Sequence, residues 1–125
     1  MFEIDLKYYY DVYGGNVLPP NDSAVKILNR AFRQINIICR NRLKNGEIDN
    51  YDEDVQNTVK TIICEQADFD VKNDDLINSA LEKYTINGVT IEYATNSQIS
   101  NINGVLINSA LYDELNLTGL TYRGL

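Results

Sequence analysis

The chain has 125 residues and a net charge of −7. This length is enough for one domain with an apolar core of its own, so the fold needs neither a metal ion nor a disulfide to stabilise it. The acidic balance argues against a protein that grips nucleic-acid phosphates, because such binding needs clustered Lys and Arg. Two interpretations of the charge remain, namely ordinary solubility and a channel wall along which DNA slides without sticking.

The sequence contains two cysteines, Cys39 and Cys64, and no histidine. Zinc binding is therefore not expected. Each cysteine falls in an apolar helical pattern, which favours a buried, reduced thiol, and a disulfide between two helices is the alternative. Met1 leads directly into Phe2-Glu3-Ile4-Asp5, and no stretch approaches about 18 apolar residues, so we expect neither a signal peptide nor a membrane span.

Residues 1–21 are predicted to form an extended or looped N-terminal arm. Tyr8-Tyr9-Tyr10 and Tyr13 cluster there, followed by Gly14-Gly15 and Pro19-Pro20. Glycine and proline pairs interrupt regular structure, and the tyrosines are expected to pack through their rings.

Residues 22–72 are predicted to form an antiparallel helical hairpin. The first helix, about 22–44, begins with Asp22 or Ser23 as N-cap and ends at Asn45-Gly46. Its expected inward positions recur at three and four residues: Ala24, Leu28, Ala31, Phe32, Ile35, Ile38 and Cys39. The acidic run 51–54 stands at the start of the second helix, which ends near Lys72. Its expected inward positions are Val55, Val59, Ile62, Ile63, Ala67 and Val71.

A small β-hairpin is predicted at residues 84–93, because two alternating segments flank Asn87-Gly88, a strong hairpin signal. Residues 95–103 are rich in Asn and Ser and are predicted to be a linker. A last short helix is predicted from Leu106 to Leu117, with Ile107, Ala110, Leu111 and Leu115 facing inward. The predicted fold class is therefore mainly α, with a helical hairpin, a short C-terminal helix, a small β-hairpin and an extended C-terminal tail.

The last nine residues, 117–125, are apolar, aromatic and broken by Gly119. A helix that stops at Gly119 leaves Leu120, Tyr122 and Leu125 on a segment too short to pack back deeply, so we expect the tail to dock on another protein. The alternative is a tail that lies on its own domain.

No combination of residues predicts catalysis. The chain has no histidine base, no GxSxG turn, no phosphate-binding glycine loop and no dinucleotide fingerprint. The acidic runs lack the spacing of a calcium loop, and helix capping explains them. We therefore expect no enzyme, no metal and no cofactor.

The order of parts resembles the head-tail connector, or adaptor, proteins of long-tailed bacteriophages. The resemblance lies in Leu18-Pro19-Pro20 before the first helix, Arg40-Asn41-Arg42-Leu43 at its end, and Ile63-Cys64-Glu65-Gln66-Ala67-Asp68-Phe69 in the second helix. It continues in the hairpin around Asn87-Gly88, in Tyr112-Asp113-Glu114-Leu115, and in the ending from Thr118 to Leu125, which is its most specific part. The family pattern does not match 73–83 or 95–103.

The resemblance implies a structural virion protein in the neck, present in the host cytoplasm during assembly, with the whole chain, 1–125, as one connector domain. Copies would form a ring, dodecameric like the portal, that binds the portal, extends the DNA channel and receives a tail-side neck or tail terminator protein. DNA would only pass through, and no membrane would be involved. Residues 106–125 would form the C-terminal helix and docking tail.

The resemblance also assigns hypothetical roles to individual residues. Those expected to bind the portal or another partner are Tyr112, Leu117, Leu120, Thr121, Tyr122, Arg123 and Leu125. Those expected to make subunit contacts are Arg30, Arg33, Arg40, Arg42, Ile86, Val89 and Ile91. Apart from the resemblance, the basic face of the first helix is interpreted as a solvated surface, a contact with an acidic partner or a weak DNA contact, in that order.

The alternative function is a small helical regulatory or antitoxin-like protein. It would dimerise through its helical hairpin and mask a partner with its tail, so it predicts a compact dimer rather than a ring.

Overall fold

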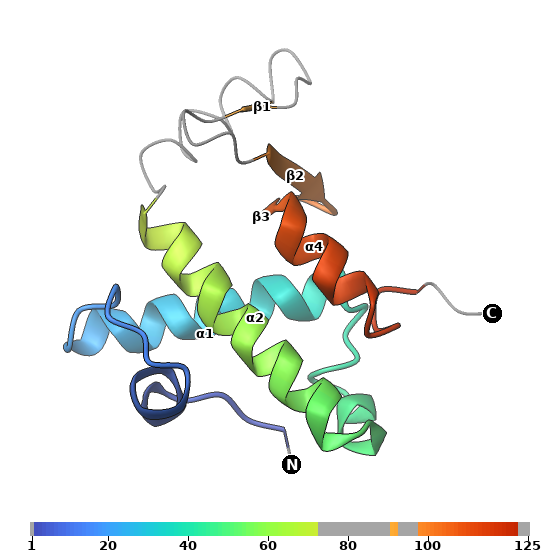
Figure 1. The fold of residues 1–125 in the computed structure, drawn as a ribbon, viewed down its shortest axis with the longest axis horizontal. Coiled ribbons are helices and arrows are strands. Elements are labelled where there is room, and N and C mark those ends of the chain that lie inside the picture. The colour runs from blue at the N-terminus through green and yellow to red at the C-terminus, as the bar shows by residue number, and fades with distance from the viewer. Residues whose placement is uncertain (1, 73–90, 93–97, 123–125) are drawn as a thin grey trace.

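The computed structural model describes residues 2–72, 91–92 and 98–122 (Figure 1). The described chain is mainly helical with a small antiparallel sheet, as predicted. Its helices are η1 (Tyr8–Val12), α1 (Asp22–Ile38), η2 (Glu47–Asn50), α2 (Glu53–Lys72) and α4 (Ser109–Asn116). Its strands are β1 (Ile91–Glu92), β2 (Gln98–Ile102) and β3 (Val105–Asn108). Most of the β-hairpin predicted at 84–93 lies outside the described residues.

The core forms where α1 and α2 cross in opposite directions (Figure 1). The predicted apolar positions of α1 are buried, except for the half-buried Phe32. In α2 the central positions are buried, and the two outermost, Val55 and Val71, are half-buried. The 3.6-residue period places these side chains on one face of each helix, so the two faces meet and exclude water.

The first helix is shorter than predicted, because it ends at Ile38 and not near residue 44. Arg40 and Asn41 have left-handed backbones, with φ of 58° and 65°, which no helix accommodates. The Asn41 N–H donates to the Asn36 carbonyl at 2.9 Å, and the Asn36 side chain accepts from the N–H groups of Leu43 and Lys44. This side chain replaces the helical hydrogen bonds, so the chain turns at residues 39–45.

The start of α1 also differs in detail from the prediction. Its N-cap is Asn21, whose side chain accepts from the Ser23 N–H at 2.9 Å, so neither Asp22 nor Ser23 has that role. Asn, Asp and Ser are about equally good N-caps, so the sequence alone does not choose among three neighbours.

The N-terminal arm contains a helical turn where an extended or looped segment was predicted. Its tyrosines do pack through their rings: the centroids of Tyr9 and Tyr10 lie 5.0 Å apart, and those of Tyr9 and Tyr13 lie 5.5 Å apart. Tyr9 is fully buried, and its hydroxyl donates to the Asp68 carboxylate of α2 at 2.5 Å. Tyr13 donates to the other oxygen of Asp68 at 2.9 Å. A single carboxylate on α2 thus holds the arm on the core.

The Tyr9 side chain also shapes the loop that leads into α1. Its hydroxyl accepts from the N–H groups of Val17 and Leu18, each at 3.1 Å. A Cβ on Gly15 would lie 2.2 Å from the Tyr9 ring, so only glycine fits beside it. Burial and the Asp68 carboxylate together raise the pKa of Tyr9, which keeps the hydroxyl protonated as a donor.

The linker predicted at 95–103 is wrong for residues 98–102, which form β2. β2 pairs with β3 in an antiparallel hairpin whose turn is Asn103-Gly104, with φ of 54° and 88°. The last helix accordingly begins at Ser109 and not at Leu106, with Asn108 as N-cap. Ile107 and Leu115 are buried as predicted, Leu111 is half-buried, and Ala110 is exposed, contrary to prediction.

Tyr9→Phe should lower the free energy of unfolding by about 1–3 kcal/mol, because it leaves two N–H groups and a buried part of Asp68 without their hydroxyl partner. Chemical denaturation measures this. Tyr8→Phe is the matched control, since the Tyr8 hydroxyl makes no hydrogen bond to any residue that the structure describes. Equal denaturation midpoints for the two variants would contradict this role of Tyr9.

Candidate protein-binding site

The C-terminal segment, residues 117–122 after α4, folds back on the core while two of its apolar side chains point outward. Leu115 and Leu120 are fully buried, whereas Leu117 is 89% exposed and Tyr122 is 66% exposed. Gly119 has φ of +81°, a left-handed conformation that lets the chain reverse after the helix. The Thr118 hydroxyl donates to the Leu115 carbonyl and accepts from the Leu120 N–H at 3.1 Å. These bonds hold the C-terminal segment in one conformation.

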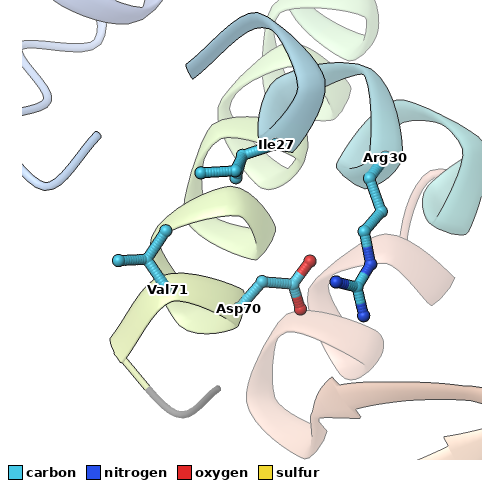
Figure 2. A pocket seen from close by; sticks show the side chains of 4 residues that line it. All are labelled: Ile27, Arg30, Asp70 and Val71. Atoms are coloured by element: carbon cyan, nitrogen blue, oxygen red, sulfur yellow. The ribbon is translucent and has the colours of Figure 1, made fainter. Parts of the chain in front are cut away.

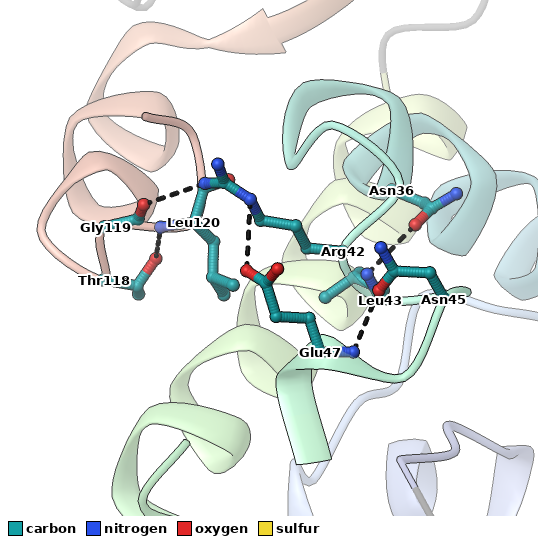
Figure 3. Close-up of polar contacts among 8 residues, drawn as sticks. All are labelled: Asn36, Arg42, Leu43, Asn45, Glu47, Thr118, Gly119 and Leu120. Carbon is teal, nitrogen blue, oxygen red and sulfur yellow. Dashed lines mark hydrogen bonds and ion pairs between the residues drawn. The ribbon is translucent and has the colours of Figure 1, made fainter. Parts of the chain in front are cut away.

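Arg42 ties this segment to the turn after α1. Its Nη1 donates to the carbonyl oxygens of Gly119, at 3.2 Å, and Leu120, at 2.9 Å, while its Nε lies 3.2 Å from Glu47 (Figure 3). The Arg42 side chain is only 16% exposed. Hydrogen bonds from a charged donor are stronger than neutral ones, so this side chain anchors a segment 77 residues further along the chain.

The expectation that the tail cannot pack back is wrong for Leu120. The residue lies in the apolar core with Leu43 and Ile48, so its side chain is not available to a partner in this structure. Of the other predicted partner-binding residues, Leu117 and Tyr122 are exposed, and Tyr112 and Thr121 are half-buried. Arg123 and Leu125 lie outside the described residues.

Arg42→Gln should release the C-terminal segment without unfolding the core. Hydrogen exchange at the amides of residues 117–122 should become at least about tenfold faster, because two charge-assisted hydrogen bonds are lost. Hydrogen-exchange mass spectrometry measures this. Arg33→Gln, at an exposed position on α1, is the control, and equal exchange in the two variants would show that Arg42 does not anchor the segment.

A shallow depression of about 550 Å³ adjoins the anchored segment. Its described lining comes from the turn after α1, the β2–β3 turn, α4 and the C-terminal segment: Arg40, Asn101, Ile102, Asn103, Tyr112, Asn116, Thr121 and Tyr122. Arg40, which was predicted to make a subunit contact, thus lies near Tyr112, Thr121 and Tyr122, which were predicted to bind the portal or another partner. The three asparagines of this lining were not predicted as site residues from the sequence, although Asn103-Gly104 is a hairpin signal of the same kind as Asn87-Gly88.

The residues predicted to make subunit contacts lie in different surroundings where the structure describes them. Arg33 and Arg40 are exposed, but Arg42 serves the internal contact described above. Arg30 lines a pocket of about 270 Å³ between α1 and α2, where its guanidinium and the Asp70 carboxylate point toward each other (Figure 2). Ile86 and Val89 lie outside the described residues, as does the side chain of Ile91.

Acidic side chains meet where α4 packs on α2. The pKa of Glu65 is raised, first by burial and then by the charges of Glu114 and Asp68. The ionised form of Glu65 is therefore disfavoured in the folded protein relative to the unfolded chain, in which its pKa is close to about 4.3. Its favourable contribution to stability is complete below that pH and is lost as the pH rises through the folded-state pKa.

Glu65→Gln should raise the free energy of unfolding at pH 7, because it removes a disfavoured charge. The gain should shrink as the pH falls toward about 4, where Glu65 is protonated in both states. Urea denaturation of both proteins across this pH range checks the expectation, with the exposed Glu3→Gln as control. A gain that is unchanged at pH 4 would contradict the assignment to ionisation.

The described residues include two buried cysteines and no metal-binding cluster. Cys39 and Cys64 are free and buried, as predicted, and burial raises the pKa of each thiol to about 12, which leaves almost no thiolate at neutral pH. No cluster of three or more Cys, Asp or Glu side chains able to hold a metal ion occurs in the described ranges. Among the helices described, none is long and apolar enough to cross a membrane.

No family model matches the chain, and neither a curated protein nor a solved structure matches it. The functional proposal therefore depends on the geometry of the chain's own residues. The geometry makes the anchored C-terminal segment a candidate protein-binding surface.

Proposed function

We propose that the chain is a structural head-tail connector that binds a phage portal through its C-terminal segment, in a ring of copies, and joins the head to the tail. The observation that carries the proposal is the exposure of Leu117 and Tyr122 on a segment that Leu120 and Arg42 hold against the core. Covering an apolar side chain that is 89% exposed would be favourable, and two exposed apolar side chains on one ordered segment offer a partner a common contact.

An anchored C-terminal segment binds a partner more tightly than a disordered tail would, which favours a permanent assembly. A segment that is already ordered loses less conformational entropy on binding, so more of the apolar burial contributes to affinity. Each exposed anchor contributes about 1.5–3 kcal/mol when it is buried, which is weak for one copy. Many copies in a ring would bind together far more tightly than one copy alone.

The charge of the chain is consistent with the proposed channel. A net charge of −7 repels DNA phosphates over most of the surface, which suits a wall past which DNA moves. The exposed apolar residues Val25 and Ile37 of α1 offer further contact area for neighbouring copies.

The double substitution Leu117→Asp and Tyr122→Ala should weaken portal binding at least about a hundredfold, because two apolar anchors are lost. The test mixes the purified chain with the portal protein encoded in the same genome and images the particles by electron microscopy. Rings on the portal should form with the unaltered chain and disappear with the double variant. Because both side chains are exposed, the free energy of unfolding should change by less than about 0.5 kcal/mol each.

Two control variants sharpen this experiment. Val12→Asp alters an apolar residue of similar exposure on the N-terminal arm and should leave portal binding intact. Leu120→Ala should instead lower stability by about 2–5 kcal/mol, since it empties a core position, so it tests the fold and not the contact. A stable dimer that ignores the portal would overturn the connector proposal and favour the regulatory alternative.

A further inference from the structure

The depression beside the C-terminal segment has one cation in an otherwise neutral lining. Arg40 is the only charged residue among the side chains described there, and the others offer two phenol rings, three amides, a hydroxyl and one aliphatic group. Phenols and amides donate hydrogen bonds, whereas the Thr121 hydroxyl already donates to the Asn116 side chain, and no described carboxylate competes for the guanidinium. A lining of this kind is suited to an anionic group that accepts several hydrogen bonds.

Arg40 differs from its neighbour Arg42 in what it contacts. Arg42 is occupied by two carbonyl oxygens and Glu47, whereas Arg40 is exposed and forms no ion pair with any residue that the structure describes. The left-handed backbone at Arg40 costs stability. The Asn36 side chain, which accepts from the Lys44 N–H, holds the backbone of this turn in place. The turn therefore directs Arg42 inward to the C-terminal segment and leaves Arg40 at the depression.

We propose that this depression binds carboxylate side chains from an acidic segment of the partner protein. The inference rests on the proposed function, because the segment would belong to the partner that covers Leu117 and Tyr122. A guanidinium binds a carboxylate through two parallel N–H donors, and Tyr112 and Tyr122 add rings and hydroxyl groups around the same space.

The observations favour a protein segment over a nucleic acid. Binding to a phosphate backbone depends on several clustered cations, but the described lining has one cation in a chain with a net charge of −7. A depression of about 550 Å³ holds a few side chains, which fits a short peptide segment. The net charge of −7 disfavours acidic partners overall, so recognition of one depends on local cations such as Arg40.

The test uses fluorescence anisotropy with three labelled probes at low salt. They are a six-residue peptide with three glutamates, the same peptide with three glutamines, and a single-stranded DNA of six nucleotides. The glutamate peptide should bind best, and Arg40→Gln should weaken its binding at least tenfold. Arg33→Gln removes the same charge from an exposed position on α1 outside the depression and should change binding by less than twofold.

Several results would overturn the inference. Equal losses in the two arginine variants would assign binding to the general basic face of α1, and equal binding of the two peptides would exclude carboxylate recognition. Tighter Arg40-dependent binding of the DNA would replace the protein segment with a nucleic acid. Absence of binding at millimolar glutamate peptide would also overturn it. Because none of these measurements uses the portal, their failure is distinct from failure of the connector proposal.

Discussion

The apolar contact between α1 and α2 supports every other described part of the structure. The N-terminal arm and the C-terminal segment, residues 117–122, are both attached to this core by buried side chains and hydrogen bonds. Tyr9 places the N-terminal arm against Asp68 of α2, and Leu120 places the C-terminal segment beside Arg42 after α1. Because burial of the two helical faces contributes most of the apolar stabilisation, loss of this contact would release both attachments.

The turn after α1 links the core to the proposed binding surface. The Asn36 side chain holds the turn that follows the helix, and the two left-handed residues of that turn direct Arg42 to the C-terminal carbonyl groups and Arg40 to the depression. A helix continued to residue 44, as the sequence predicts, would place Arg42 in register with the buried positions Ala24, Leu28 and Ile35. The proposed partner-binding role of the C-terminal segment therefore depends on a turn far from it in the sequence, and the anchored segment would meet a partner with little reorganisation.

The distribution of charge gives the proposed surface its selectivity. Burial, and after it the charges of Glu114 and Asp68, raises the pKa of Glu65, so the chain tolerates a local repulsion beneath the helix that leads into the proposed binding segment. Arg40 provides a cation within an acidic protein. In the proposed site, its guanidinium would discriminate between partners and would not attract them over long distances. Exposed apolar anchors would supply the affinity, and the guanidinium would decide which segment can lie beside them.

The sequence by itself determined the two long helices, their inward faces, the buried free thiols and the ring packing of the tyrosines, because these follow from spacing along the chain. It also indicated an unusual C-terminal segment, but not that Leu120 turns inward while Leu117 stays exposed. Only the tertiary structure decided that, since it depends on how Leu120 joins the apolar core and on the hydrogen bond from Arg42 to its carbonyl oxygen. The early end of α1 and the β2–β3 hairpin were likewise decided by side-chain caps and strand pairing between residues whose local patterns also suit a helix or a linker.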